Sequence, residues 1–130
     1  MRLLPFARDL ERNLTHSVLP IWVLQELADR GDTYGYALME RLRERGGPNY
    51  RVPPSVLYPL LARLRADGFV ESLYGRESHG PVRKYYRITS TGRRALREAE
   101  RVLDRMRPGP ETVGRPSEPL ATVSGTPGRV

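Results

Sequence analysis

Hydroxyl and guanidinium side chains that could bind a phosphate group occur together in one short segment of the chain. Ser55, Tyr58 and Arg63 alternate there with leucines at helical spacing. A serine or tyrosine hydroxyl can bond a phosphate oxygen, and an arginine can bind phosphate or the O6/N7 edge of guanine through two hydrogen bonds. Two alternatives without a binding role remain open: Tyr58 could pack between two helices, and Arg63 could be an ordinary solvated arginine.

A second group of basic side chains lies farther along the chain, on or beside a loop that contains glycine. Its members are Arg76, His79, Arg83 and Lys84. A flexible cationic loop of this kind can follow a phosphate backbone or enter a narrow minor groove. The alternative is an ordinary solvated hairpin, and a lone loop histidine such as His79 often has no special role.

The sequence shows no set of residues typical of a catalytic site. The two histidines, His16 and His79, stand far apart, and the carboxylates are scattered among arginines, where solvated ion pairs are the default. The absence of cysteine excludes thiolate catalysis, disulfides and zinc fingers, and it agrees with a reducing cytoplasm. We therefore expect no enzyme, no catalytic residue, no metal and no cofactor.

The charge of the chain favours a polyanionic partner. Its 22 Lys and Arg residues against 15 Asp and Glu residues give a net charge of +7. Cationic side chains gain free energy by displacing the counterions condensed on nucleic-acid phosphates. No apolar run approaches the roughly 20 residues of a membrane-spanning helix. Double-stranded DNA is therefore the expected partner, with no membrane association and with a cytoplasmic location, nucleoid-associated when the protein is bound to DNA.

Hydrophobic periodicity predicts the elements that position these side chains. The predicted order is a helix over 13–30, a helix capped by Asp32 or Thr33 and ending near Arg45, a helix over 54–67, strands over 69–74 and 84–88, and a helix over 90–106 capped by Thr89. Pro20 falls inside the first helix, so that helix either kinks there or begins its regular part near Pro20.

The two ends of the chain are expected to lie outside the folded domain. Residues 108–130 hold five of the twelve prolines and few large apolar side chains, so we predict a disordered tail. The predicted organisation is an N-terminal extension over 1–12, a DNA-binding domain over 13–89, a dimerisation helix over 90–107 and this tail.

Helices followed by a two-stranded hairpin form the order of a winged helix, a mainly α fold with a small β-hairpin. Three runs of residues add to this pattern: Tyr34-Gly35-Tyr36, the run from Leu57-Tyr58-Pro59 to Gly68-Phe69-Val70, and the run from Gly80-Pro81 to Gly92. With these runs the chain closely resembles the phenolic-acid-decarboxylase regulator (PadR) family of winged-helix transcription factors, over about residues 15–106.

This resemblance implies a homodimeric transcription factor, usually a repressor, whose C-terminal helix crosses to the partner subunit near its first helix. The apolar stripe of the last predicted helix independently lacks a partner within so small a domain. The predicted DNA-binding residues are Tyr36, Ser55, Tyr58, Arg63, Arg76, His79, Arg83 and Lys84. The predicted dimer interface is Leu14, Val18, Trp22, Leu96, Ala99, Val102, Leu103 and Met106.

Similar regulators respond to small aromatic or cationic compounds, which makes an effector an expectation of the resemblance. Trp22 is the only tryptophan, and it serves either core or dimer packing or an effector pocket at the interface. The chain also departs from the family pattern where Pro53-Pro54-Ser55-Val56 replaces a start of the Ser-Pro-Gly-Thr type. This departure leaves open where the third helix begins and whether Ser55 binds phosphate.

We therefore predict a sequence-specific regulator, most simply a repressor, that binds a palindromic operator as a homodimer. Its half-sites would lie about one helical turn apart or somewhat less. The competing hypothesis is a winged helix that binds protein or acts as an architectural DNA-binding module, since the fold serves both uses. Concentration of positive charge on the third helix and the wing favours the regulator.

Overall fold

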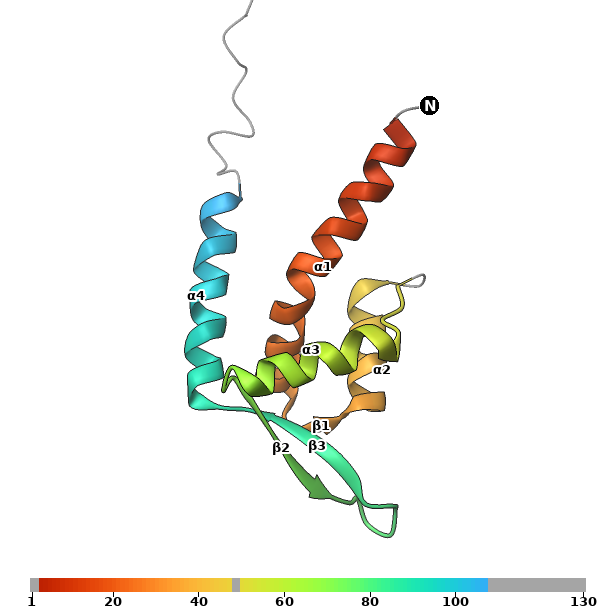
Figure 1. Cartoon of the computed structure of the whole chain (residues 1–130), viewed down its shortest axis with the longest axis vertical. Coiled ribbons are helices and arrows are strands. Elements are labelled where there is room, and N and C mark those ends of the chain that lie inside the picture. Colours follow the sequence, from red (N-terminus) through yellow and green to blue (C-terminus); the bar gives the residue numbers. More distant parts are fainter. Residues whose placement is uncertain (1–2, 48–49, 108–130) are drawn as a thin grey trace, which may run out of the picture. The chain divides into compact units, whose positions relative to one another are not determined.

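The computed structural model describes residues 3–47 and 50–107, and Figure 1 shows the arrangement of their elements. The helices are α1 (Leu3–Arg30), α2 (Gly35–Gly46), α3 (Pro54–Ala66) and α4 (Ser90–Met106), and the strands are β1 (Thr33–Tyr34), β2 (Val70–Gly75) and β3 (Arg83–Ile88). The chain divides into two compact units, residues 1–100 and 101–130. The tail predicted over 108–130 lies outside the described residues.

The hydrophobic core is built around α3. Its four leucines predicted to face inward, Leu57, Leu60, Leu61 and Leu64, are all buried. They pack with buried side chains of α1 and α2, and with residues of the sheet and α4. This packing confirms the helical period of the segment, and it leaves the remaining side chains of α3 on the surface.

A third strand enlarges the predicted hairpin. The sheet is antiparallel in the order β1-β3-β2, with Thr33 opposite Tyr86 and Tyr34 opposite Tyr85. The prediction that Asp32 or Thr33 caps α2 is therefore wrong: Tyr34 holds the N-cap position and makes no side-chain cap. Asp32 instead accepts a 2.9 Å hydrogen bond from Nε of Arg87 on β3. A strand of two residues is too short to show an alternating pattern in sequence.

Helix α1 begins at Leu3 and not at Asn13, so residues 3–12 form its first turns and are not a separate extension. These turns carry exposed apolar side chains, among them Leu4, Phe6 and Leu10. Pro20 lies inside the helix, which does not begin there. A proline removes one internal hydrogen bond, and α1 continues to Arg30 because the following turns bury Val23 and Leu27 in the core.

The start of α4 is fixed to the end of α3 by a small network around Thr89. The predicted Thr89 cap is confirmed: its hydroxyl accepts a 2.9 Å hydrogen bond from the backbone N–H of Gly92 and donates a 2.6 Å bond to the carbonyl of Gly68. Gly68 has φ +81°, a left-handed conformation that suits the residue after a helix. A Cβ on Gly92 would overlap the carbonyl oxygen of Phe69.

Replacing Gly92 by alanine should therefore destabilise the fold. The added Cβ would also lie 2.8 Å from Cγ1 of Ile88, so α4 or β3 must shift. We expect a loss of about 1–3 kcal/mol in the free energy of unfolding, measured by urea denaturation. Gly75→Ala is the matched control, since its Cβ would meet Tyr85 at an ordinary 3.6 Å, and its effect should stay within about 0.5 kcal/mol. Equal effects of the two changes would contradict this account.

Candidate nucleic-acid interface

Four of the predicted DNA-binding residues come together at one surface hollow of about 260 Å³. They are Tyr36 from the first turn of α2, Tyr58 from the middle of α3, and Arg83 and Lys84 from the start of β3. The hollow is further lined by Tyr34, Gly35 and Tyr86. Three elements distant in sequence thus place two exposed tyrosines and two cations on one side of the domain. Hydroxyl and ammonium donors in this arrangement suit phosphate oxygens.

Tyr58 reaches this hollow because Gly35 has no side chain. A Cβ on Gly35 would overlap the hydroxyl of Tyr58 and would lie 2.7 Å from its Cε1 atom. The ring of Tyr58 is therefore seated on the backbone at the start of α2, while 42% of the residue remains exposed. Tyr36 stands beside it with 61% exposure. The glycine between Tyr34 and Tyr36 is what lets α2 and α3 present their tyrosines together.

Aromatic contacts hold Arg83 at the edge of the hollow. Its guanidinium carbon lies 4.3 Å from the ring centroid of Tyr34, a cation–π contact. Tyr34 in turn meets Tyr85 edge to face at 5.5 Å, across the pairing of β1 with β3. This stack restricts Arg83 while its donors stay exposed to solvent. The short strand β1, absent from the sequence-based prediction, is therefore part of the site.

Arg65 belongs to this surface, although sequence analysis did not place it among the DNA-binding residues. A hollow of about 190 Å³ next to the first is lined by Tyr58, Ala62, Arg65 and Lys84, among others. Nη1 of Arg65 donates a 3.1 Å hydrogen bond to the hydroxyl of Ser72 on β2, which orients the guanidinium. The sequence could have indicated this position, because Arg65 follows Tyr58 by two helical turns and so lies on the same side of the helix.

Arg63 lies on a different side of α3. It lines a hollow with His16, Leu19 and Pro20 of α1, and none of the tyrosines borders that hollow. Ser55 is exposed in the first turn of α3, on the same helical face as Tyr58. The structure thus places Arg63 on a different side of α3 from Tyr58, because residues five positions apart point in different directions on a helix.

Arg76 and His79 lie in the exposed loop between β2 and β3. Figure 1 shows this hairpin extending beyond the helices of its unit. Ser78 has φ +48°, and the backbone N–H of Gly80 donates a 2.7 Å hydrogen bond to the carbonyl of Glu77, so the tip is a tight turn. Neither Arg76 nor His79 borders the hollow around Tyr58, and both are carried at the end of the hairpin instead.

The paired tyrosines of β3 divide as their alternation predicts. Tyr86 is buried at 7% exposure, whereas Tyr85 is partly exposed and lies against Tyr34. Burial raises the pKa of Tyr86 and also that of Tyr85 above the ordinary value. A raised pKa keeps both phenols neutral at physiological pH, so the wing gains no negative charge from them.

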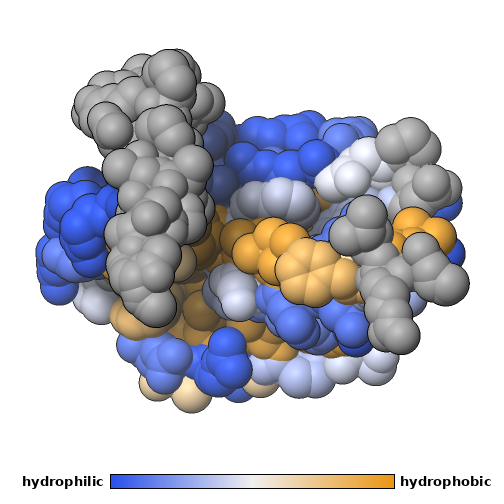
Figure 2. Space-filling view, turned by 90° about the horizontal axis from the view of Figure 1, so that it is seen from above, coloured by the Kyte–Doolittle hydropathy of each residue, from blue (hydrophilic) through white to orange (hydrophobic). Residues whose placement is uncertain are grey.

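The residues predicted for a dimer interface differ in how far they are exposed, from buried through partly buried to exposed. Leu96 is buried at 7% exposure in the core of its own chain, so this prediction needs correction: its side chain has little surface left for a partner. Val18 and Ala99 are partly buried. Exposed apolar side chains remain at Leu14 (53%), Val102 (40%), Leu103 (39%) and Met106 (76%). Hydrophobic surface is visible among hydrophilic side chains on the face seen in Figure 2.

Trp22 is engaged in packing within its own chain. Its ring meets Tyr50 edge to face at 5.5 Å, and the guanidinium carbon of Arg45 lies 5.6 Å from the indole centroid. Arg45 also donates a 3.2 Å hydrogen bond to the carbonyl of Trp22. A cation of the chain itself therefore lies over one face of the indole, which is then not open to an aromatic or cationic effector.

Residues 3–47 and 50–107 hold neither a helix suited to span a membrane nor a cluster of metal-ligating side chains. Within these ranges no helix combines the length and the apolar character needed to cross a membrane. Within the same ranges no three His, Cys, Asp or Glu side chains gather closely enough to hold a metal ion.

Comparison with known proteins identifies relatives of this chain. Residues 23–98 match the transcriptional regulator PadR-like family. A transcriptional regulator of Mycobacterium tuberculosis is 37% identical over 95 residues, which are 73% of this chain and 84% of that protein. An uncharacterized protein of Lysinibacillus sphaericus is 37% identical over 67 residues, and the chain spans 62% of its length.

Solved structures of PadR-type regulators also resemble this chain. The crystal structure of a PadR family regulator from Eggerthella lenta superimposes with a TM-score of 0.67 at 33% identity, covering 80% of this chain and 88% of that one. A PadR-like regulator from Bacillus cereus gives a TM-score of 0.62 at 27% identity, with 89% and 93% of the two chains covered.

The contact between Gly35 and Tyr58 can be tested without any ligand. Gly35→Ala should destabilise the chain because the new Cβ displaces the Tyr58 ring. In a Tyr58→Ala background the same change should be close to neutral, since the ring is gone. We expect a coupling of about 1 kcal/mol or more from the double-mutant cycle, measured by urea denaturation. Additive effects would show that Tyr58 does not rest on Gly35.

Proposed function

The chain belongs to the PadR-like family of transcriptional regulators, and we propose on that premise that it represses transcription as a homodimer on a palindromic operator. The family assignment makes the chain a DNA-binding regulator of transcription and not an enzyme. The single observation that carries the proposal is the hollow where Tyr36, Tyr58, Arg83 and Lys84 meet.

The donors around this hollow would bind the phosphate backbone. Tyr36, in the first turn of α2, and Tyr58, in the middle of α3, offer hydroxyl groups, and Lys84 offers an ammonium group beside them. Such contacts fix the position of the protein on the duplex without reading sequence. Arg76 and His79, at the tip of the hairpin, would contact the adjacent backbone or minor groove.

Base recognition would fall to the outward face of α3. Ser55, Tyr58, Ala62 and Arg65 lie along one side of this helix, opposite its buried leucines. Arg65 is held by Ser72 and presents a guanidinium that can bind the O6/N7 edge of guanine. We therefore assign the specific contact to Arg65 in place of Arg63, which borders α1.

Dimerisation would use the apolar side chains that the chain leaves exposed on its first and last helices. Leu14 on α1, and Val102, Leu103 and Met106 on α4, carry this surface. A two-fold dimer presents two copies of α3, so its operator would be an inverted repeat with half-sites about one helical turn apart. A small-molecule effector that changes DNA affinity completes the proposal, at a site other than the occupied face of Trp22.

Footprinting on the DNA upstream of the gene for this chain tests the proposal directly. We expect protection of an inverted repeat, because each subunit places one α3 in the major groove. Affinity should fall on the order of a thousandfold between about 50 and 200 mM salt as released counterions return. Binding with the same affinity to every fragment would favour an architectural role, and absence of DNA binding at low salt would refute the proposal.

Lys84→Gln tests whether Lys84 contacts a DNA phosphate directly or contributes only to the overall positive charge of the chain. We expect weaker binding to all duplex sequences and a decrease of about 1 in the slope of log affinity against log salt, measured by fluorescence anisotropy. Arg94→Gln is the matched control, because Arg94 is an exposed arginine of α4 whose guanidinium lies 3.4 Å from the hydroxyl of Thr91, outside the hollow. Equal losses in the two variants would remove Lys84 from the interface.

A further inference from the structure

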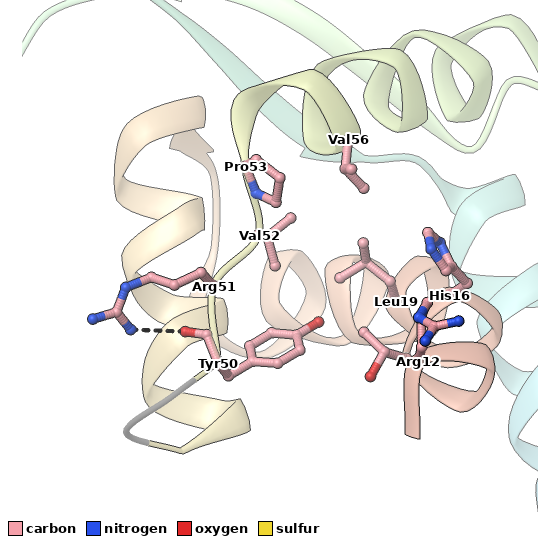
Figure 3. Close-up of a pocket in the computed structure, with 9 residues that line it drawn as sticks. Arg12, His16, Leu19, Tyr50, Arg51, Val52, Pro53 and Val56 are labelled. Atoms are coloured by element: carbon pink, nitrogen blue, oxygen red, sulfur yellow. Dashed lines mark hydrogen bonds between the residues drawn. The ribbon is translucent and has the colours of Figure 1, made fainter. Parts of the chain in front are cut away.

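Helix α3 contacts the rest of the domain on two sides. On the side toward α1, Figure 3 shows Val56 at the start of the helix facing Leu19 across a pocket of about 180 Å³. On the side toward the wing, a polar side chain of the helix reaches the sheet. Nη1 of Arg65 donates a 3.1 Å hydrogen bond to the hydroxyl oxygen of Ser72 on β2. This contact joins the helix that we propose reads bases to the hairpin.

The contact between Arg65 and Ser72 arises from a tight reversal of the chain after α3. Gly68 has a φ of +81°, and its backbone N–H donates a 3.0 Å hydrogen bond to the carbonyl of Arg65. Strand β2 therefore begins directly beside the last turn of the helix. Ser72 lies on the same face of this strand as the buried Val70, because the two residues are two positions apart. Its hydroxyl thus points toward α3.

The sheet fixes the position of the Ser72 hydroxyl. Ser72 pairs with Tyr86 on the central strand β3, and Tyr86 is buried at 7% exposure. A serine has only one side-chain torsion between its backbone and its oxygen, so this oxygen has few places to go. The side chain of Arg65 is exposed and would otherwise populate many rotamers. A fixed acceptor therefore selects one orientation of the guanidinium before DNA arrives.

The acceptor is also neutral, which leaves the charge of Arg65 available to DNA. Arg87, on the opposite face of the sheet, lies 2.9 Å from Asp32 and 3.8 Å from Glu71. The hydrogen bond to Asp32 raises the pKa of Arg87, and the two carboxylates compensate its charge. Within the described part of the chain no carboxylate forms an ion pair with Arg65. A guanidinium bound to one hydroxyl keeps further N–H donors for a base.

We propose that Ser72 is a positioning residue for base recognition, which sets the orientation in which Arg65 meets the O6/N7 edge of a guanine. Two hydrogen bonds to this edge require the guanidinium to lie in the plane of the base. A guanidinium in another orientation binds phosphate instead, which carries no sequence information. The wing thereby contributes to sequence preference through α3. This inference rests on the proposed function and extends it to a residue that does not itself touch the base.

The contact can be measured in the free protein. Nitrogen-15 relaxation of the arginine Nε–H groups reports how restricted each guanidinium is. We expect a lower order parameter for Arg65 in Ser72→Ala than in the wild-type chain, and recovery in Ser72→Thr, which keeps the hydroxyl. Arg63 is the internal reference, because it borders α1 and should not change. An unchanged order parameter for Arg65 in Ser72→Ala would refute the positioning role.

Base preference is measured on the footprinted operator with each base pair placed in turn at every position of one half-site. The guanine read by Arg65 is the one whose preference disappears in Arg65→Gln. There we expect Ser72→Ala to lower the preference for guanine roughly fivefold, the scale on which ordering one side chain affects affinity. Ser72→Thr should keep the preference. The slope of log affinity against log salt should not change, since no charge is removed.

Thr91→Ala is the matched control for the loss of a hydroxyl. The hydroxyl of Thr91 also accepts a hydrogen bond from an arginine, Arg94 at 3.4 Å, but on α4. This change should leave the guanine preference as it is in the wild-type chain. A loss in Ser72→Ala that is equal at all positions, together with a lower free energy of unfolding in urea, would show a general structural role for Ser72 and overturn the proposal.

Failure of this inference and failure of the proposed function give different results. Loss of the guanine preference in Arg65→Gln without any loss in Ser72→Ala would refute the role of Ser72 alone. Retention of every base preference in Arg65→Gln would refute the assignment of the specific contact to Arg65, and this inference with it. Absence of DNA binding by the wild-type chain would refute the proposed function, whereas the relaxation measurement needs no DNA.

Discussion

The burial of one side of α3 is the interaction on which the rest of the structure depends. Leu57, Leu61 and Leu64 are at most 4% exposed, and they anchor the helix against α1 and α2. Because side chains on a helix have fixed directions, this anchoring also determines which residues point outward. Tyr58 and Arg65 face the hairpin for the same reason that the leucines face the core. The hydrophobic contact that stabilises the domain thus also orients the face that we propose binds DNA.

The sheet supplies the second half of that face. Strand β3 lies in the centre, paired with β2 on one side and with the short β1 on the other. Pairing with β1 brings Tyr34 under Arg83, and Gly35 follows directly as the surface on which Tyr58 rests. The start of α2, the middle of α3 and the base of the wing are therefore held together by adjacent residues.

Elements with strong periodicity were predictable from sequence, and contacts between elements were not. The spacing of the leucines predicts α3, and the residue type of Thr89 predicts the cap of α4. Strand β1 exists only because β3 is beside it, so no local pattern marks it. The sides taken by Arg63 and Arg65 depend on where α1 packs. For the same reason Leu96, on an apolar stripe without an evident partner, turns out to be core.

Helix α3 has two sides that border different surface hollows of the domain. Tyr58 and Arg65 occupy the side toward the wing, whereas Val56 and Arg63 occupy the side toward α1. Both sides belong to one helical backbone, which lacks one internal hydrogen bond at Pro59, so a displacement of one side would move the other. Closely packed interiors transmit such displacements because they contain little free volume to absorb them. The pocket at the start of α3 is therefore close to the surface proposed to bind DNA, although none of its lining residues borders the hollow around Tyr58.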